Sequence, residues 1–328
     1  MSPADYSRRR VVGDARDGRE SASAHARSIP AELAGMRLDQ ALARLFPSHS
    51  RTRLRAWIDA GRVTVNDETW DAAHRVAGGE HVDVAPPPAE PSLVDAPQDI
   101  ALSIVFEDDS IFVVDKPAGF VVQPGSGNRE GTLLNALLHH DAALGAVPRA
   151  GIVHRLDKDT SGLMVVARTI EAQTDLVRKL AARRIAREYL ALARGDLRRA
   201  TIIDAPIGRH PTKRTTMAVV TRGKPARTHV AIVEHFGIAT LLRVTLETGR
   251  THQIRVHLAA IGHPLVGDPA YGGKSLVALP PFARQALHAT RLSLPHPRTN
   301  ESMSWESSPP PDFASLVQAL RSSRSDAR

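Results

Sequence analysis

A proline-rich segment constrains this 328-residue chain more than any other feature. Residues 85–99 (APPPAEPSLVDAPQD) hold five prolines. Proline fixes φ and lacks a backbone donor, so neither a helix nor an inner strand continues through such a run. This composition is typical of a semi-rigid linker. We therefore predict a small domain at residues 31–84, the linker at 85–99 and a larger domain at 100–312.

The two ends of the chain lack the periodicity of packed elements. Residues 1–30 are rich in Arg, Ser, Asp and Gly and are predicted to be a disordered tail, and residues 313–328 are predicted to be a C-terminal tail. The N-terminal segment has no apolar core of the kind found in secretory signals, and no run approaches about 18 apolar residues. We expect a cytoplasmic protein without a membrane span.

The small domain reads as two short helices followed by two short strands. Leu38, Leu42 and Leu45 recur at helical spacing. The segment RTRLRAWIDA predicts a second helix, with Ser50 as its N-cap and Gly61 just past its end. The apolar pattern then shortens to RVTVN and EHVDV, which is typical of strands.

Positive charge gathers in two places. Arg51, Arg53 and Arg55 crowd the second helix, and Lys213 and Arg214 lie in a stretch with six Lys or Arg and no acid, residues 205–227. Both regions fit either a solvated surface or contacts to phosphate groups. The whole chain has 43 Lys and Arg against 35 Asp and Glu, a net charge of +8, which favours a polyanionic partner.

The larger domain is predicted to be α+β. Its apolar segments are short, and several follow one another after only a turn: LSIVFED, SIFVVDKP, GLMVVAR, REYLALAR, THVAIVEHF and TLLRVTLET. Such spacing favours antiparallel pairing. Helices are predicted at 131–140, at 169–185 with Thr169 as cap, and from Thr251 to Gly262. We therefore expect a mixed, largely antiparallel β-sheet flanked by helices.

The densest polar segment is GIVHRLDKDTSGLMVVA, residues 151–167. Its polar residues lie at the joint of two apolar strands, where they are costly unless solvated or used. One interpretation is a charged hairpin loop. The other is a carboxylate that Arg155 and Lys158 keep ionised, ready to act as base or nucleophile. The DKDT pattern also fits a phosphatase with an aspartate nucleophile, which would need a parallel α/β sheet.

A second polar segment, residues 241–273, surrounds the predicted helix that opens at Thr251. Arg250 and Arg255 flank its N-terminus, a region that attracts anions. The histidines of this segment lack the spacing of metal ligands, so we expect them to satisfy local hydrogen bonds and predict no metal site. The chain has no cysteine, which excludes disulfide scaffolds, thiolate nucleophiles and iron–sulfur clusters.

These segments together resemble the RluA-type family of RNA pseudouridine synthases, preceded by an S4 RNA-binding domain. The likeness covers about residues 31–312 and depends on VVDKPAGFVVQPGSGNREGTLLNALLHH, GIVHRLDKDTSGLMVVART, REYLALARG, IGRHPTKRTTMAV and TGRTHQIRVHLAAIGHPLVGDPAYGG in this order. The resemblance implies isomerisation of uridine to pseudouridine without a cofactor. It also implies RNA as partner, large-subunit ribosomal RNA in particular, and a monomer is expected. A non-catalytic ribosome-assembly factor is the alternative.

The resemblance also assigns roles to single residues. It implies that Asp157 is the essential aspartate, that Arg255 pairs with it, and that Tyr189 packs on the uracil and assists proton removal. Arg155 resembles the arginine that helps to extrude the target base, and Ile254 resembles the aliphatic residue that lines the pocket. From its strand pattern alone, Tyr189 fits equally a core tyrosine that shares one face with two alanines, Ala191 and Ala193. Gln123 departs from the histidine that the family more often has.

Overall fold

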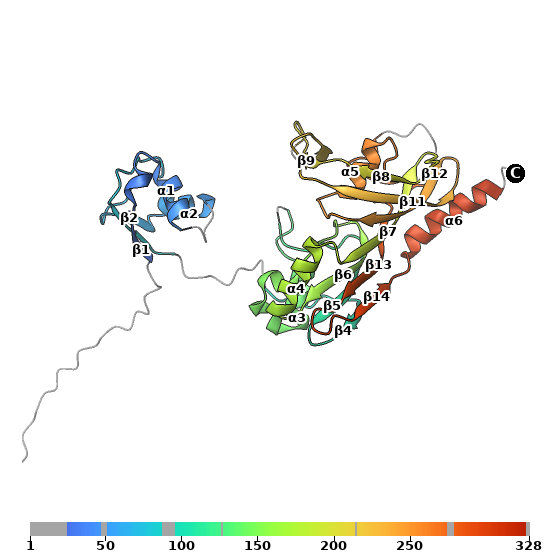
Figure 1. Cartoon of the computed structure of the whole chain (residues 1–328), viewed down its shortest axis with the longest axis horizontal. Helices are drawn as coiled ribbons and strands as arrows, with labels where there is room; N and C mark the ends of the chain where they lie inside the picture. The colour runs from blue at the N-terminus through green and yellow to red at the C-terminus, as the bar shows by residue number, and fades with distance from the viewer. Residues whose placement is uncertain are drawn as a thin grey trace, which may run out of the picture. The chain divides into compact units, whose positions relative to one another are not determined.

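The computed structural model describes residues 25–46, 51–86, 96–125, 127–213, 215–273 and 279–325. The chain divides into two compact units, Met1–Ser92 and Leu93–Arg328. Each unit is described by itself below (Figure 1). Within the described part, no helix is long and apolar enough to cross a membrane.

The first unit packs two helices on a three-stranded antiparallel sheet. Its elements are β1 (His25–Ser28), a 3₁₀ turn η1 (Ala31–Leu33), α1 (Leu38–Leu45), α2 (Arg51–Asp59), β2 (Val63–Val65) and β3 (His81–Val84), with strand order β1-β3-β2. Leu38, Leu42 and Leu54 from the helices are fully buried against Val65 and Val82 from the strands. The predicted helical and strand patterns therefore meet in one aliphatic core.

The N-terminal boundary predicted for this unit was wrong. His25–Ser28, assigned to the disordered tail, form β1 and pair antiparallel with β3. The segment is short and lacks an alternating apolar pattern, so its backbone hydrogen bonds to β3, rather than its side chains, stabilise the strand. Residues 1–24, the rest of the predicted tail, and Ser50, the predicted cap, lie outside the described residues.

The second unit is built on a nine-stranded, mainly antiparallel sheet, which confirms the predicted fold class. The strand order is β4-β5-β6-β13-β7-β12-β11-β8, with β14 paired to β13. The strands are β4 (Ile104–Glu107), β5 (Ile111–Lys116), β6 (Ser161–Ala167), β7 (Ala186–Arg194), β8 (Thr201–Asp204), β11 (Arg227–His235), β12 (Ala239–Leu246), β13 (Leu287–Pro295) and β14 (Ser302–Glu306). Among the described strands, only β6 and β13 pair in parallel. The phosphatase alternative needs a parallel α/β sheet and is not supported by this topology.

Helices cover both faces of this sheet. These are α3 (Leu133–His140), α4 (Ile170–Ala181), α5 (Gln253–Ala260) and α6 (Pro311–Ser325). Two 3₁₀ turns, η3 (Ala142–Ala146) and η4 (Pro148–Gly151), lie between α3 and β6. On β7, Tyr189, Ala191 and Ala193 face a core shared with α3 and α5, whereas Leu190 and Leu192 face the core of α6. Because both faces are covered, inner strands such as β6 are buried at every position.

Two helix ends differ from the predictions. Thr169 caps α4 through a bond from the Ala172 N–H, as predicted, but α4 ends at Ala181 because Arg183 has a positive φ of 58°. α5 begins at Gln253 rather than at Thr251, since His252 takes the left-handed conformation with φ 57°. A left-handed residue interrupts the helical hydrogen-bond pattern, so both helices are shorter than the segments predicted to be helical.

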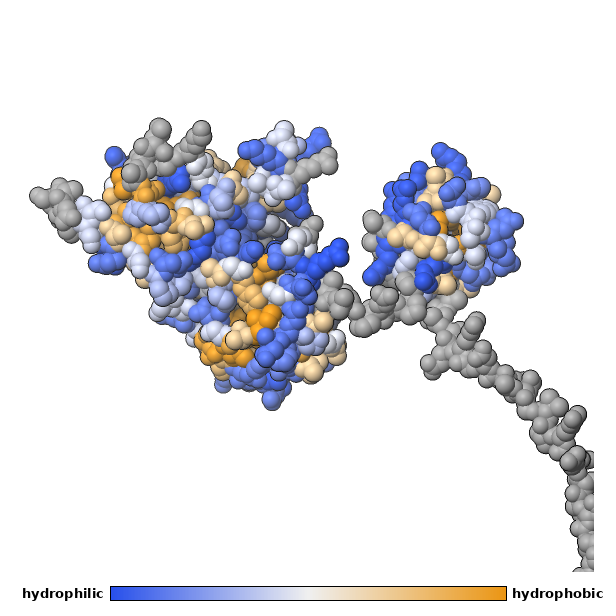
Figure 2. All heavy atoms as spheres, turned by 180° about the vertical axis from the view of Figure 1, so that it is seen from behind, coloured by the Kyte–Doolittle hydropathy of each residue, from blue (hydrophilic) through white to orange (hydrophobic). Residues whose placement is uncertain are grey.

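The predicted C-terminal tail is a helix instead. Phe313, Leu316, Val317 and Leu320 of α6 are buried against the sheet face that carries Leu192. Their spacing of three and four residues is the apolar stripe of a helix that lies on a surface. Elsewhere the surface is mainly hydrophilic, with apolar patches interspersed on both units (Figure 2).

A small two-stranded ribbon stands apart from the main sheet. It consists of β9 (Ile207–Arg209) and β10 (Met217–Val219), paired antiparallel. Its turn carries the exposed Lys213, whereas Arg214 lies outside the described residues. The ribbon packs against Val256 of α5 and against Tyr271 of the following loop, which share a small core with Ile207 and Met217.

Gly162 determines how closely β6 approaches β13. Its φ is +112°, and a Cβ at this position would lie 2.3 Å from the carbonyl oxygen of Ala289. We expect Gly162→Ala to lower the free energy of unfolding of the second unit by roughly 3 kcal/mol, since backbone atoms must move. Thermal denaturation should show a Tm lowered by about 6–12 °C. Gly237→Ala is the control: its φ is +79° with open space around the Cβ, so the cost should be about 1 kcal/mol. Equal losses in the two variants would contradict the prediction.

Candidate active site

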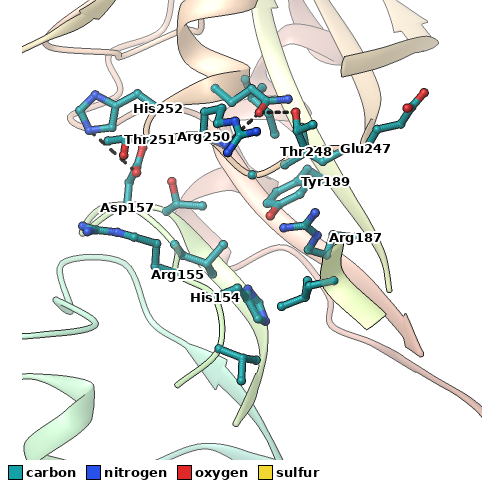
Figure 3. Close-up of a pocket in the computed structure, with 18 of the residues that line it drawn as sticks. His154, Arg155, Asp157, Arg187, Tyr189, Glu247, Thr248, Arg250, Thr251 and His252 are labelled. Carbon is teal, nitrogen blue, oxygen red and sulfur yellow. Dashed lines mark hydrogen bonds and ion pairs between the residues drawn. The ribbon is translucent and has the colours of Figure 1, made fainter. Parts of the chain in front are cut away.

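Three segments that are distant in sequence line one cavity of about 520 Å³ in the second unit. They are the loop from Arg149 to Thr160, the start of β7, and the turn from β12 into α5 (Figure 3). The volume suits a single small organic group such as a nucleobase. The two polar segments singled out in the sequence therefore form walls of the same pocket.

Asp157 presents its carboxylate to this pocket. Its Oδ2 accepts a hydrogen bond from Arg255 Nη1 at 2.9 Å, and its Oδ1 lies 3.9 Å from His252 Nε2. The side chain is 17% exposed, so it is shielded from bulk water yet reachable from the cavity. The charged hydrogen bond from the guanidinium fixes the orientation of this carboxylate.

Arg255 is itself held by a second carboxylate, Asp268. Arg255 donates from Nε to Oδ2 at 2.7 Å and from Nη2 to Oδ1 at 2.9 Å. The Asp268 side chain is fully buried and also accepts bonds from the N–H groups of Ala270 and Tyr271. Burial alone would raise the pKa of Asp268, but the guanidinium and the two N–H donors outweigh it and hold the pKa below its usual value. This pair leaves only Nη1 of Arg255 directed at Asp157.

Tyr189 forms an apolar wall of the pocket. Its side chain is almost wholly buried, and burial raises the pKa of its phenol, although the nearby Arg187 opposes that rise. The phenol is therefore protonated at neutral pH. Ile254, the first buried apolar residue of α5, lines the same cavity, and the exposed Arg155 lies at its rim. The structure thus brings together five of the predicted site residues, counting Asp157 and Arg255.

His252 connects the pocket to the basic ribbon. Its Nδ1 lies 2.8 Å from the Tyr271 hydroxyl, which accepts a bond from the Met217 N–H of β10. Burial lowers the pKa of His252, so the ring is neutral at pH 7. The Tyr271 ring also lies 5.0 Å from the Arg255 guanidinium carbon. One tyrosine therefore contacts the ribbon, the histidine and the arginine that holds Asp157.

Sequence reasoning missed two residues that support the site. Asp268 lies in GDPAYGG, where the only signal was an acid inside a glycine-rich loop. Lys116 is buried, and its Nζ donates to the carbonyls of Pro117, Phe120 and Lys158, which fixes the loop that follows Asp157. Burial lowers the pKa of Lys116 to about 7, while the nearby acids Asp159 and Asp157 raise it.

Four predicted RNA-contact residues lie elsewhere in the chain. Arg51 binds the buried Asp39 with its Nη2 2.7 Å from Oδ2, and Arg55 lies 3.7 Å from Asp59. Arg53 is exposed on the same helix, and Lys213 is exposed in the ribbon turn. Arg51 therefore stabilises the first unit, in addition to any role in binding.

The histidines of the 241–273 segment make local hydrogen bonds, as predicted. His257 bonds to the Thr228 hydroxyl and the Ala205 carbonyl, and His263 bonds to the Arg194 carbonyl. Across the described residues, no group of three His, Cys, Asp or Glu side chains is arranged to hold a metal ion.

Comparison with known proteins places these features in one family. The sequence profile described as RNA pseudouridylate synthase matches residues 110–260, and that of the S4 domain matches residues 36–82. The ribosomal large subunit pseudouridine synthase D of Nitrosomonas europaea is 54% identical over 302 residues, which cover 90% of this chain and 87% of that protein. Its namesake in Escherichia coli K12 is 52% identical, covering 88% of this chain and 91% of the relative.

A solved structure shares the fold of the second unit. Human RNA Pseudouridylate Synthase Domain Containing 1 superposes with a TM-score of 0.53 at 31% identity, covering 71% of this chain and 97% of the human chain. The mixed, mainly antiparallel sheet with helices on both faces is thus the fold of a pseudouridylate synthase domain.

The buried Arg255–Asp268 pair predicts a pH-dependent stability. Asp268→Asn leaves a buried guanidinium short of its countercharge, so the free energy of unfolding at pH 7 should fall by about 3 kcal/mol. Because the folded pKa of Asp268 lies below its ordinary value of 3.8, the ionised group stabilises the fold above that pH, and this contribution is lost as pH falls further. Chemical denaturation at pH 7 and pH 3 should show the wild-type advantage shrinking in acid. The exposed Asp109→Asn serves as control, and an Asp268→Asn variant as stable as wild type at pH 7 would refute the prediction.

Proposed function

The chain belongs to the family of RNA pseudouridine synthases, and from this premise we propose that it converts uridines of large-subunit ribosomal RNA to pseudouridine with Asp157 as catalytic residue. The observation that carries the proposal is the Asp157–Arg255 contact of 2.9 Å inside a cavity that Tyr189 also lines. The large-subunit substrate follows from the relatives, which are named for that activity.

The reaction rearranges one nucleoside without net oxidation. The N1–C1′ bond breaks, the uracil turns, C5 bonds to C1′, a proton leaves C5 and N1 gains one. Asp157 serves either as nucleophile at C1′ or as base toward a sugar proton, and both uses need the ionised carboxylate. Arg255 occupies Oδ2, so Oδ1 is the oxygen that meets the sugar. The chemistry needs no redox cofactor and no nucleotide cofactor.

The target uridine must leave its stack before it reacts. Flipping costs a few kcal/mol, which contacts in the pocket and along the backbone offset. Tyr189 and Ile254 supply the apolar walls against which the uracil packs, and the protonated Tyr189 hydroxyl relays the C5 proton by receiving it while passing its own proton on to solvent. Arg155 fills the space that the base leaves, a role that its exposed position at the rim supports.

RNA binding outside the pocket belongs to the basic surfaces. The S4 match, residues 36–82, contains α2 with its exposed Arg53 and Arg55, and the ribbon turn carries the exposed Lys213. Arg214 follows Lys213 in the sequence. We propose that these residues contact phosphates, that the proline-rich segment at 85–99 links the two domains, and that the protein acts as a monomer in the cytoplasm. The net charge of +8 supports a polyanionic substrate.

Asp157→Asn tests the catalytic assignment. The variant keeps the size of the side chain but not its charge, so we expect conversion to fall at least roughly 10³-fold while RNA affinity changes little. Pseudouridine mapping of total RNA from cells with wild type or variant, together with filter binding, measures both. Asp109→Asn, an exposed acid in the β4–β5 turn, should keep full conversion. Substantial turnover by Asp157→Asn would exclude the assigned role.

Arg53→Gln with Arg55→Gln tests the S4 surface. Each lost phosphate contact lowers the slope of log affinity against log salt by about 0.7–0.9, so the double variant should lose about 1.4–1.8. Arg51 is kept, because its removal would leave the buried Asp39 without this partner. The matched control replaces Arg291 and Arg298, two exposed arginines of β13 and the following turn. An unchanged slope in the α2 variant would show that this helix does not face the RNA.

A further inference from the structure

Arg187 is a pocket residue to which the proposed chemistry assigns no role. It lies on β7 two residues before Tyr189, so both side chains project from the same face of the strand. Within the described part of the chain, its guanidinium makes no hydrogen bond or ion pair, and its Nε is a buried donor without a partner. An unpaired, half-buried guanidinium costs free energy unless a ligand supplies the acceptor.

His154 provides a second unsatisfied donor in the same wall. Its Nε2 accepts the Val165 N–H at 3.1 Å, which places the ring proton on Nδ1. That Nδ1 is buried and has no partner among the described residues. Burial, and then the positive charge of Arg187, lower the pKa of His154 to about 3, so the ring is a neutral donor. Figure 3 shows both side chains in the pocket wall next to Tyr189, with Asp157 at the other end.

The two acidic side chains that line the pocket already bind other groups of the protein. Glu247 binds His229 at 2.6 Å and pairs with Arg183, while Asp157 binds Arg255. Six arginines line the cavity against these two acids: Arg149, Arg155, Arg183, Arg187, Arg250 and Arg255. No acid among the described residues that line the cavity is therefore free to act as acceptor for Arg187, and the excess of positive charge favours an anion as its ligand.

Gly249 leaves the guanidinium accessible from the mouth of the pocket. A Cβ at this exposed position would lie 2.8 Å from Arg187 Nη1, so any side chain would push the arginine aside. The planar fork of arginine matches two oxygens of a phosphate, and a bare backbone beside it lets a nucleic acid strand approach closely.

We propose that Arg187 and His154 form a subsite for one phosphodiester of the RNA, next to the uridine that enters the pocket. The inference rests on the proposed function and adds a binding step to it. Arg187 is a positioning residue for the RNA strand. It contributes to RNA affinity and to the register of the bound RNA, whereas Asp157 takes part in the reaction. A phosphate held here fixes the backbone on the far side of Tyr189 from the carboxylate.

Single-turnover kinetics on an unmodified rRNA fragment that contains a target uridine test the subsite. Arg187→Gln should raise the RNA concentration at half-maximal rate about 10–100-fold, as for a lost charged hydrogen bond, with the maximal rate changed less than about threefold. Arg187→Lys should recover part of the affinity. The control is Arg184→Gln, an exposed arginine in the loop before β7 that does not line the cavity, which should behave as wild type. A fall in maximal rate with unchanged half-saturation would overturn the proposal.

Neutral linkages in the RNA identify the phosphate. A methylphosphonate is placed in turn at each linkage flanking the target uridine. At one linkage, the methylphosphonate should lower the RNA affinity of wild type about as much as Arg187→Gln lowers the affinity for unmodified RNA. At that linkage it should not lower the affinity of Arg187→Gln any further. An equal loss of affinity in wild type and variant at every linkage would show that Arg187 contacts no phosphate. If Arg187→Gln is unstable, the same comparison is made with Arg187→Lys. Failure of the proposed function itself is separate, because wild type would then form no pseudouridine on unmodified RNA.

Discussion

The site depends on how Arg255 divides its donors between two carboxylates. Nε and Nη2 bind the buried Asp268, and only Nη1 is left for Asp157. A guanidinium shared in this way is fixed in plane and position before any substrate arrives, so the orientation of Asp157 is set by the protein rather than by the RNA. Asp268 in turn accepts two backbone N–H bonds from its own loop, so the 268–271 turn contributes to the geometry that orients Asp157.

The surroundings of the pocket follow from a sheet that is apolar on both faces. β7 places Tyr189 on the face shared with α5, and α5 brings Ile254 and Arg255 to the same place. The loop that carries Asp157 enters β6, whose seven residues are all buried and therefore rigid. Three segments far apart in sequence thus reach one cavity because aliphatic packing holds each of them near its end.

Much of this could be predicted from the sequence, and the exceptions share a physical reason. Tyr189 on a strand face with two alanines and Thr169 as a helix cap depend on local spacing, which a sequence shows directly. The Asp268–Arg255 pair, the buried Lys116 and the Arg187 guanidinium, which lacks a partner among the described residues, depend on the packing of distant segments, which no local pattern encodes. The left-handed backbone of His252 delays the start of α5 to Gln253. The apolar stripe of α6 lies beyond the predicted end of the larger domain and was assigned to a tail. The periodicity of the apolar residues indicated where most elements lie, but only the folded structure shows which partners the charged groups have.

The position of β13 has a consequence for biosynthesis. β6 and β7 are not neighbours: β13 lies between them and hydrogen-bonds to both. The strand that joins the wall of Asp157 to the wall of Tyr189 begins 120 residues after β6 ends, as 287 − 167 shows. At about 5–20 residues per second, a ribosome needs roughly 6–24 s to supply it. A nascent chain therefore carries the segments of Asp157 and Tyr189 for seconds before the strand between β6 and β7 has been made, and a product truncated before Leu287 lacks that strand.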